Sequence, residues 1–273
     1  MGLRVNTNIA SLTAQRNLGQ VSTRLQGNFS RLSSGLRIAR AADDAAGLGI
    51  SERMRAQIRS YTSAERNAQD GISLVQTAEG ALNEVNNILS RMRELAIQAA
   101  NGTLSTTDRT TIDTEFQELS SEISRIASTA SFNGVTLLDG GTTSLDIQAG
   151  INSGEIITIT LQDTTTTSLG INGLDVTSAV NAVATLTTLD TAIDSVVSAR
   201  GGLGSAQNRL LSSIASITNT RENLSAAESR IRDVDVATET ADLTRNSILQ
   251  QAAVAVLGQA NVQPQLALQL LQG

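Results

Sequence analysis

Two neighbouring carboxylates, Asp43 and Asp44, are the side chains of this sequence best suited to acid–base chemistry. A general acid and a general base must face one reacting atom, but consecutive residues of a helix point about 100° apart. The pair stands just before a long run of helical periodicity, where carboxylates interact favourably with the positive end of a helix dipole. We therefore expect Asp43 and Asp44 to start a helix rather than to catalyse a reaction.

The residue types on which most enzymes depend are missing from the chain. It has no His and no Cys, and all 20 basic residues are Arg, so it has no Lys. These absences remove the commonest general base, the thiol nucleophile, Schiff-base chemistry and most transition-metal ligands. We expect no enzymatic activity, no cofactor and no metal site.

Two glycine-rich strings are superficially similar to phosphate-binding loops. They are Gly47-Leu-Gly49 and Gly201-Gly-Leu-Gly204, and neither follows a strand pattern or has the full GxGxxG spacing. A close contact between helices or a kink is the expected reason for these glycines.

The C-terminal tail has no charged residue after Arg245, as far as Gly273. Interrupting Gln and Asn residues argue against a membrane span, which needs about 20 apolar residues. The net charge of −6 argues against a nucleic-acid partner. We predict that other protein covers one helical face of the tail, at Ile248, Ala252, Ala255, Val262 and Leu266.

The strongest periodicity is a 3-4 spacing of apolar residues from Gly47 to Ala99. It predicts one helix of roughly 80 Å, a length typical of a coiled coil or helical bundle. Leu74 and Leu95 lie off this seam and indicate more than one neighbouring element. Ser105 to Asp108 has the form of a capping box for a second helix, with apolar positions at Ile112, Phe116, Leu119, Ile123 and Ile126.

The central part of the chain, about residues 131–177, changes to a period of two. Apolar residues alternate in 145–149 and again in 157–161, and Asn152 to Gly154 supplies a turn between them, which predicts a β-hairpin. Helical spacing returns from Leu186 to Ile231. The predicted fold is mainly α: a long coiled-coil or helical-bundle rod with a small central β-hairpin region.

The N-terminal forty residues carry a weaker apolar stripe that includes Leu18, Val21 and Leu25 and is interrupted at Asn28. Both ends of the chain therefore have incomplete seams. Pairing the two ends would complete both seams, and the loop entropy that opposes it grows only logarithmically with chain length. We predict that the N- and C-terminal helices pair.

Arg91 and Leu95 are four residues apart on a helix face that also carries Arg93 and Glu94. Such a charged face is usually only solvated. Leu95 breaks the pattern in one of two ways: it packs against a neighbouring helix, or it contributes to a contact surface.

Several strings along the chain resemble those of bacterial flagellin, and they occur in the same order. They include LSSGLRI at 32–38, ADDAAG at 42–47, NAQDGIS at 67–73, TAEGAL at 77–82, RELA at 93–96 and FNG at 132–134. The stretch from Ala252 to Leu271 also resembles the flagellin C-terminus. The resemblance covers essentially the whole chain.

The resemblance implies a subunit that polymerises into the extracellular flagellar filament. It implies an inner-layer helix at 1–43, a helical rod at 44–233 that includes the β region, and a second inner-layer helix at 234–273. The segment 131–177 is too short to hold the large outer domains of many flagellins. Export would occur unfolded through the flagellar type III channel, without a cleaved signal peptide.

The resemblance also implies partners beyond other copies of the chain. An export chaperone would cover the C-terminal segment, roughly Ala241 to Gly273, and hook-associated and cap proteins would meet the filament ends. The vertebrate Toll-like receptor for flagellin would contact Arg91, Leu95 and Glu115. Self-association would use Leu18, Val21, Leu25 and the stripe of the tail from Ile248 to Leu266.

Two other functions compete with the filament subunit. A hook–filament junction protein resembles flagellin at both ends and is the nearer alternative. A secreted adhesin or effector that uses helical ends only for export is the second. Abundance separates the junction protein from a filament subunit, because a filament needs many more copies than a junction. Formation of filaments by the purified protein separates the adhesin or effector.

Overall fold

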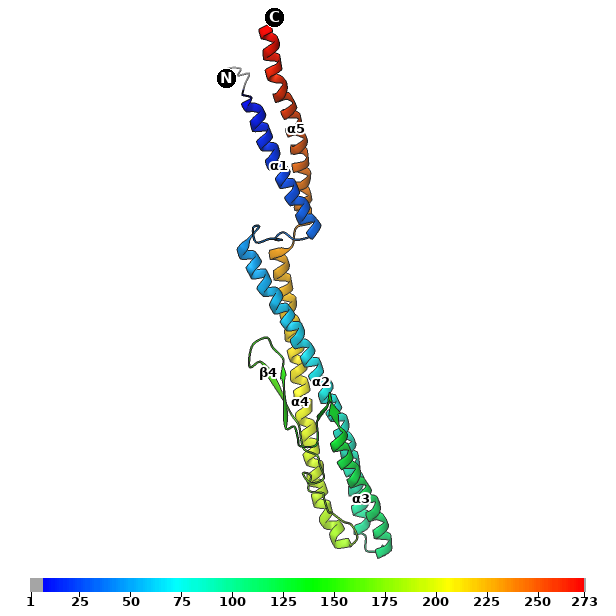
Figure 1. The fold of residues 1–273 in the computed structure, drawn as a ribbon. Coiled ribbons are helices and arrows are strands. Elements are labelled where there is room, and N and C mark those ends of the chain that lie inside the picture. The colour runs from blue at the N-terminus through cyan, green and yellow to red at the C-terminus, as the bar shows by residue number, and fades with distance from the viewer. Residues whose placement is uncertain (1–6, 273) are drawn as a thin grey trace. The chain divides into compact units, whose positions relative to one another are not determined.

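The computed structural model describes residues 7–272, with side chains as far as residue 263. Most of the chain is helical, which confirms the predicted mainly α fold. The helices are α1 (Ile9–Ser34), α2 (Ala45–Ala100), α3 (Thr106–Thr129), α4 (Ala179–Arg232) and α5 (Val236–Gln272) (Figure 1). The short strands between α3 and α4 are β1 (Ser131–Phe132), β2 (Val135–Thr136), β3 (Ser144–Gln148) and β4 (Ile156–Thr160).

The chain divides into two compact units, which we describe separately. The terminal unit comprises Met1–Ala56 and Asn223–Gly273, and the central unit comprises Gln57–Glu222. Helices α2 and α4 each contribute to both units. The terminal unit contains α1 and α5, and the central unit contains α3 and all four strands.

The core of the central unit is aliphatic, and Phe116 on α3 is its one fully buried aromatic among the described residues. The 3-4 seam predicted for α2 is confirmed from Ala64 to Ala99, where these members are almost completely buried: Ala64, Ala68, Val75, Ala78, Leu82, Val85, Leu89, Met92, Ala96 and Ala99. Nearer the start of α2 the predicted seam is wrong for Ile50 and Gln57, which are exposed. Leu74 and Leu95, which lie off that seam, are buried as well. A long helix buried on two faces needs two sets of neighbours, and α3, α4 and the strands supply them.

The turn between α2 and α3 forms as its residues predict. Ser105 accepts a hydrogen bond from the Asp108 backbone N–H and its own N–H donates to Asp108, which completes the capping box. Arg109 closes the other side of the turn by donating to the carbonyls of Ala99 and Asn101, both at 2.9 Å. The Ala99 carbonyl, in the last turn of α2, thereby gains a hydrogen-bond donor.

The strands form two separate antiparallel hairpins. In β3 and β4 the register pairs Ser144 with Thr160 and Gln148 with Ile156, and the turn lies where Asn152 to Gly154 predicts it. The smaller hairpin, β1 with β2, was not predicted. Its turn residues Asn133 and Gly134 both have positive φ, 49° and 81°, as a two-residue type I′ turn requires.

In the terminal unit, α1 and α5 lie side by side and antiparallel, as the incomplete seams predict (Figure 1). Asn8 caps the start of α1 by accepting a hydrogen bond from Ser11 N–H, and Gly35 ends the helix in the left-handed conformation at φ 71°. At the start of α5, Asp235 accepts hydrogen bonds from the N–H groups of Ala237 and Thr238.

Gly47 is the one glycine of the two glycine-rich strings that makes a close contact, and its neighbours belong to the connection before α2 rather than to another helix. A Cβ there would meet the Asp44 carboxylate and would lie 2.8 Å from Ile38 Cδ1. For the other four glycines no such neighbour lies within 4 Å in the described structure, so the expectation of close contact is wrong for Gly49, Gly201, Gly202 and Gly204, and a kink stays a prediction there.

This difference makes Gly47 and Gly49 a matched pair of test sites. Replacing Gly47 with Ala is expected to destabilise the terminal unit by about 1–3 kcal/mol through overpacking. Replacing Gly49 with Ala is expected to stabilise it by about 0.5–1 kcal/mol, because Ala is the better helix former. Urea unfolding followed by circular dichroism measures both, and equal effects of the two changes would contradict the assignment.

Candidate functional site: the paired terminal helices

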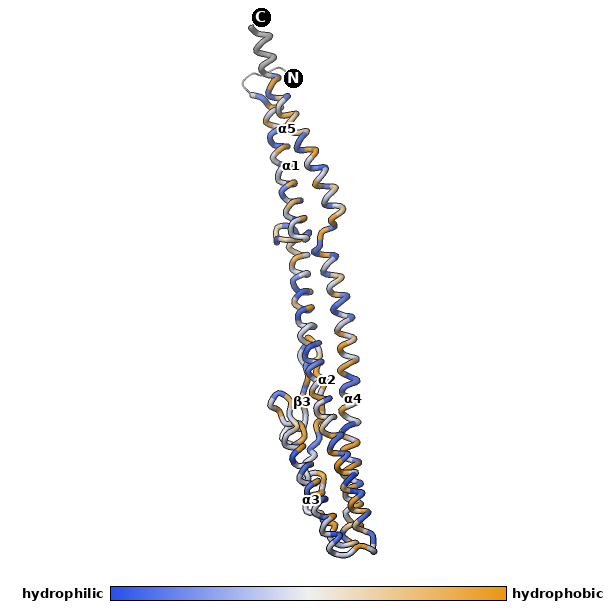
Figure 2. The backbone as a smooth tube through the Cα atoms, turned by 90° about the vertical axis from the view of Figure 1, so that its right-hand side faces the viewer, coloured by the Kyte–Doolittle hydropathy of each residue, from blue (hydrophilic) through white to orange (hydrophobic). Residues whose placement is uncertain are grey.

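The seam between α1 and α5 follows one heptad-like stripe on each helix. On α1 the buried or half-buried residues recur at 3-4 spacing: Ser11, Ala14, Leu18, Val21, Leu25, Asn28 and Leu32. On α5 they recur at 4-3 spacing: Glu239, Leu243, Asn246, Gln250, Ala253, Leu257 and Ala260. This is the spacing at which two helices pack along their length. Figure 2 shows that hydrophobic and hydrophilic stretches alternate along both helices.

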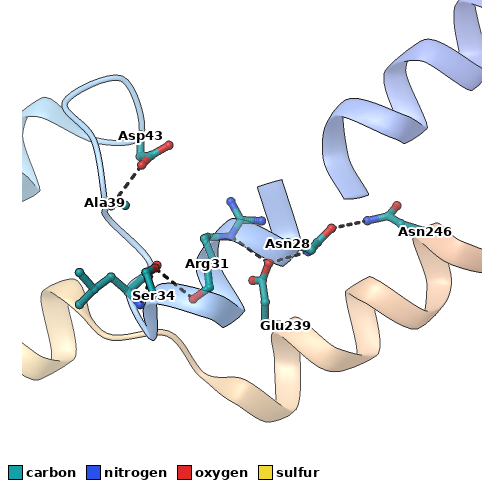
Figure 3. Close-up of polar contacts among 8 residues, drawn as sticks. Asn28, Arg31, Ser34, Ala39, Asp43, Glu239 and Asn246 are labelled. Carbon is teal, nitrogen blue, oxygen red and sulfur yellow. Dashed lines mark hydrogen bonds and ion pairs between the residues drawn. The ribbon is translucent and has the colours of Figure 1, made fainter. Parts of the chain in front are cut away.

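At the end of the seam nearest the helix connections, four polar side chains form one network (Figure 3). Glu239 Oε1 accepts a hydrogen bond from Asn28 Nδ2 at 2.5 Å and another from Arg31 Nε at 2.9 Å. Asn246 Nδ2 donates to Asn28 Oδ1 at 2.9 Å. Asn28 and Glu239 are only 2% and 8% exposed, so the network lies within the seam.

A second polar contact lies at the opposite end of the seam. Asn8 Nδ2 donates to the carbonyl of Ala260 at 2.7 Å, and Ser11 Oγ donates to Asn261 Oδ1 at 2.8 Å. Ser11 and Ala260 are both buried. The aliphatic part of the seam is therefore bounded by hydrogen bonds at both ends.

The structure separates the predicted self-association residues into two groups. Leu18, Val21 and Leu25 are half-buried and lie in the α1–α5 seam. Ile248, Ala252, Ala255 and Val262 are exposed, with Ile248 at 60%, so their face of α5 does not meet α1. Pairing within the chain thus covers a different face of the tail from the predicted stripe. Leu266 lies outside the residues whose side chains are described.

An uncharged and partly apolar surface of α5 therefore remains uncovered in the single chain. In addition to the predicted stripe, Leu249, Val254 and Val256 are 44%, 55% and 59% exposed. Among the described residues, no helix is long and apolar enough to cross a membrane. A surface of this kind is typical of a protein–protein contact.

The connections between the helices are tied together by backbone hydrogen bonds. Leu36 and Asp233 form an antiparallel bridge, and Arg37 N–H donates to the carbonyl of Arg232 at 2.7 Å. The Arg37 guanidinium donates to the carbonyl of Ile231, through Nη2 at 2.5 Å and Nε at 3.2 Å. Arg37, from the string LSSGLRI, thus caps the C-terminus of α4.

An ion pair joins α2 and α4 in the same unit. Arg232 Nη1 lies 2.6 Å from Glu52 Oε1, and Arg55 approaches the same oxygen at 3.3 Å. The hydrogen bond from Arg232 is the main cause that lowers the pKa of the Glu52 carboxyl below its ordinary value of 4.5. The ionised carboxylate is therefore the form that the folded unit favours.

The lowered pKa predicts how Glu52 affects stability at different pH. A carboxylate with a lowered folded pKa stabilises the fold fully above its unfolded pKa and loses this contribution as the pH falls through the folded value. We expect Glu52→Gln to be destabilising at pH 7, by a small amount because the Glu52 carboxylate is half-exposed to water. The difference from the unchanged protein should shrink as the pH falls below 4.5. Urea midpoints at several pH values test this, and a difference that grows with acidity would contradict it.

The two carboxylates that could have done chemistry have structural roles. Asp43 Oδ2 accepts hydrogen bonds from the N–H groups of Ala39 and Arg40. Asp44 Oδ1 accepts from Gly47 N–H at 2.9 Å, at the start of α2, as the sequence predicts. Each carboxylate is committed to backbone donors of its own segment. The described residues include no group of three or more acidic side chains that could hold a metal ion.

Arg91 and Glu115, on α2 and α3 of the central unit, form an exposed pair. Arg91 donates to Glu115 Oε1 through Nε at 3.0 Å and Nη2 at 2.8 Å, and to Glu94 Oε2 at 3.1 Å. The hydrogen bond with Glu115 is the main cause that raises the pKa of Arg91. Leu95 is only 2% exposed. It therefore packs in the core, one of the two roles considered for it, and the single chain does not present its side chain to a partner.

The polar partners on α5 could not be recognised from the sequence. Glu239, Asn246 and Gln250 lie on the seam but are polar, so an apolar periodicity misses them. The only available signal was on α1, where Asn28 interrupts a 3-4 stripe. A polar residue at a seam position usually has a partner on the facing helix.

The fold is helical, its two ends pair, and an apolar surface of α5 stays uncovered. The candidate acids Asp43 and Asp44 bind backbone N–H groups. These features define a self-associating structural protein. A family model of the bacterial flagellin N-terminal helical region matches residues 5–143, and one of the bacterial flagellin C-terminal helical region matches 186–271. The chain belongs to the bacterial flagellin family. It is a structural subunit of the flagellar filament that polymerises with itself, and not an enzyme.

Two flagellar proteins align with the chain over nearly its full length. Flagellin of Halalkalibacterium halodurans is 49% identical over 98% of this chain and 99% of that protein. The flagellar filament 30.7 kDa core protein of Treponema maltophilum is 43% identical, with the same coverage. The crystal structure of Bacillus cereus flagellin has a TM-score of 0.52 and 39% identity, and covers 60% of this chain and 94% of that one. The alternative of a junction protein gains no better support from these relatives.

Proposed function

We propose that the protein builds the extracellular flagellar filament by packing the uncovered surface of α5 against other copies of the chain. The observation that carries this proposal is the exposed, uncharged surface of α5 that includes Ile248, Val254, Val256 and Val262. Burying such a surface between copies removes apolar area from water at about 25 cal/mol per Å², which drives association. The filament core protein of Treponema maltophilum supports the same role.

The proposal assigns layers to the segments of the chain. Segments 1–43 and 234–273 would form the inner layer of the filament, and segment 44–233 would form the layer outside it. Two backbone hydrogen bonds support boundaries near 43 and 233, because they join the two chain segments in which these boundaries lie. Val234 N–H donates to the carbonyl of Gly35, and Arg37 N–H donates to the carbonyl of Arg232. The short β region would leave the second layer as the outer surface.

Seeded polymerisation tests the proposed function. Purified protein is added to short filament fragments of the same chain, and growth is followed by electron microscopy. Long filaments are expected from the full chain. Protein with intact termini that never extends the seeds would contradict the filament role and would favour the adhesin or effector alternative.

The family supports further partners as part of this proposal. An export chaperone would cover roughly Ala241 to Gly273 until assembly, and hook-associated and cap proteins would bind the ends of the filament. Export through the type III channel would deliver the unfolded chain without a cleaved signal. The exposed α5 surface supports the chaperone, because an uncovered apolar segment is prone to aggregation.

The proposal includes binding of the single subunit to the vertebrate Toll-like receptor for flagellin. Arg91 and Glu115 are exposed and would make the contact, whereas Leu95 is buried and would not. We expect Arg91→Ala to weaken receptor binding at least tenfold, since loss of a charged contact at an interface costs about 2 kcal/mol or more. Surface plasmon resonance with the monomer measures it, with Arg125→Ala on α3 as the control. Equal binding by both variants would exclude the Arg91 contact.

A further inference from the structure

The apolar residues of α5 do not by themselves select which face of the helix meets α1. Leu243 and Leu257 are half-buried in the seam, but Ile248, Val254 and Val256 lie on other sides of the helix and remain exposed. Several rotations of α5 about its own axis would bury a comparable set of aliphatic side chains. Hydrophobic burial is non-directional, so it discriminates weakly between these rotations.

The face that meets α1 is partly polar. Its seven positions include Glu239, Asn246 and Gln250, together with the small residues Ala253 and Ala260. Two leucines, Leu243 and Leu257, also lie on this face, whereas Ile248 and Leu249 lie outside it and are exposed. Aliphatic burial alone therefore does not single out the observed face.

The network of Asn28, Arg31, Glu239 and Asn246 has the properties needed for that selection. It joins both helices through three hydrogen bonds of 2.5 to 2.9 Å, and one of them is an ion pair. Turning α5 by one residue, about 100°, would carry Glu239 away from Arg31. Asn28, only 2% exposed, would then be buried without its partners, which the fold strongly disfavours.

We propose that this network sets the rotation of α5 on α1 and thereby determines which face of α5 is presented to other copies of the chain. Glu239 and Asn28 are the specificity-determining residues. Buried polar pairs act in this way in coiled coils, where a single one specifies register and partner. The statement about rotation concerns the single chain, and only the link to assembly rests on the proposed function.

Disulfide formation can report the rotation, because the chain has no Cys of its own. Ser11 Oγ lies 2.8 Å from Asn261 Oδ1, so thiols at these two positions would be adjacent. The next residue, Val262, points away by about 100°. Two reporters are made, Ser11→Cys with Asn261→Cys and Ser11→Cys with Val262→Cys. With the network intact, the 11–261 disulfide is expected to form at least tenfold faster than the 11–262 disulfide.

The reporters are measured in filaments that contain them as a small minority among unmodified chains. Each Cys-bearing chain is then surrounded by Cys-free copies, so every disulfide is intramolecular. The same measurement on the soluble chain keeps the test of rotation independent of assembly. A failure of the proposed function would appear as missing filaments, and a failure of the network as a wrong disulfide preference.

The decisive variant moves the polar residues by one position without changing composition. It combines Glu239→Thr with Thr240→Glu, and Asn246→Ser with Ser247→Asn. Rotation of α5 should follow the moved residues, so that the 11–262 disulfide becomes the faster one. Filament yield should fall at least tenfold, because a different face now points outward. An unchanged preference for 11–261 would overturn the proposal, and a reversed preference with full filament yield would overturn its link to assembly.

A second variant tests the proposal if α1 and α5 do not pair in the first variant. Asn28→Leu with Glu239→Leu makes the seam apolar, so α1 and α5 should still pair but with less than threefold preference between the two disulfides. Retention of a tenfold preference for 11–261 would show that the network does not set the rotation. Absence of both disulfides would also overturn the proposal, since it would show that the network is needed for pairing itself.

Discussion

Deleting residues 248–273 is expected to abolish filament formation while the central unit keeps its fold. The deletion removes the exposed Ile248, Val254, Val256 and Val262 and the half of the seam that includes Leu257 and Ala260. The core of the central unit lies entirely between Ala68 and Leu210, so it loses no buried side chain. Electron microscopy after seeding measures the filaments, and thermal melting of the soluble chain measures the fold.

A milder control distinguishes loss of the surface from loss of the helix. Val254→Ser with Val256→Ser makes two exposed residues polar and leaves every seam position of α5 in place. It should slow seeded growth, whereas the deletion should stop it. Filaments formed by the deleted chain at normal yield would exclude α5 as the assembly surface.

Replacing Phe116 with Ala is expected to cause the largest loss of stability of any single substitution considered. The ring is completely buried on α3 within the central core. Truncating a buried Phe to Ala costs about 3–5 kcal/mol, because it removes apolar contacts and leaves a cavity. For a unit of this size each 1 kcal/mol lowers the melting temperature by roughly 2–4 °C. Differential scanning calorimetry of the monomer should show a fall of about 10 °C.

Val183→Ala on α4 is the matched control, because Val183 is 57% exposed. A surface truncation of this kind changes stability by only about 0.5 kcal/mol or less. A similar melting temperature for the two variants would mean that α3 does not depend on Phe116 to pack against the central unit.

Apolar periodicity and capping residues predict much of the fold. The apolar spacing from Gly47 to Ala99 predicts α2 almost to its ends, and Ser105 with Asp108 predicts the start of α3. The alternation of Ile157 and Ile159 predicts β4. These features depend on residues close together in the chain, and local geometry is enough to specify them.

Local sequence information does not predict whether Leu95 is buried or exposed. Its spacing is compatible with a core position and with an exposed contact position. The decision depends on the elements that surround α2, which come from residues far away in the chain. The structure buries Leu95 and leaves Arg91 and Glu115 exposed.

The sequence by itself determined that the tail is uncharged and that both chain ends are helical. It also determined that the incomplete apolar seams of these ends must pack against other helices. Only the tertiary structure decided which face of α5 meets α1. Apolar side chains lie on several sides of α5, so their pattern allows more than one rotation. The choice requires Asn28 and Arg31 to meet Glu239, more than 200 residues away in the chain. Hydrogen bonds are directional, and only the folded arrangement reveals which donors and acceptors face each other.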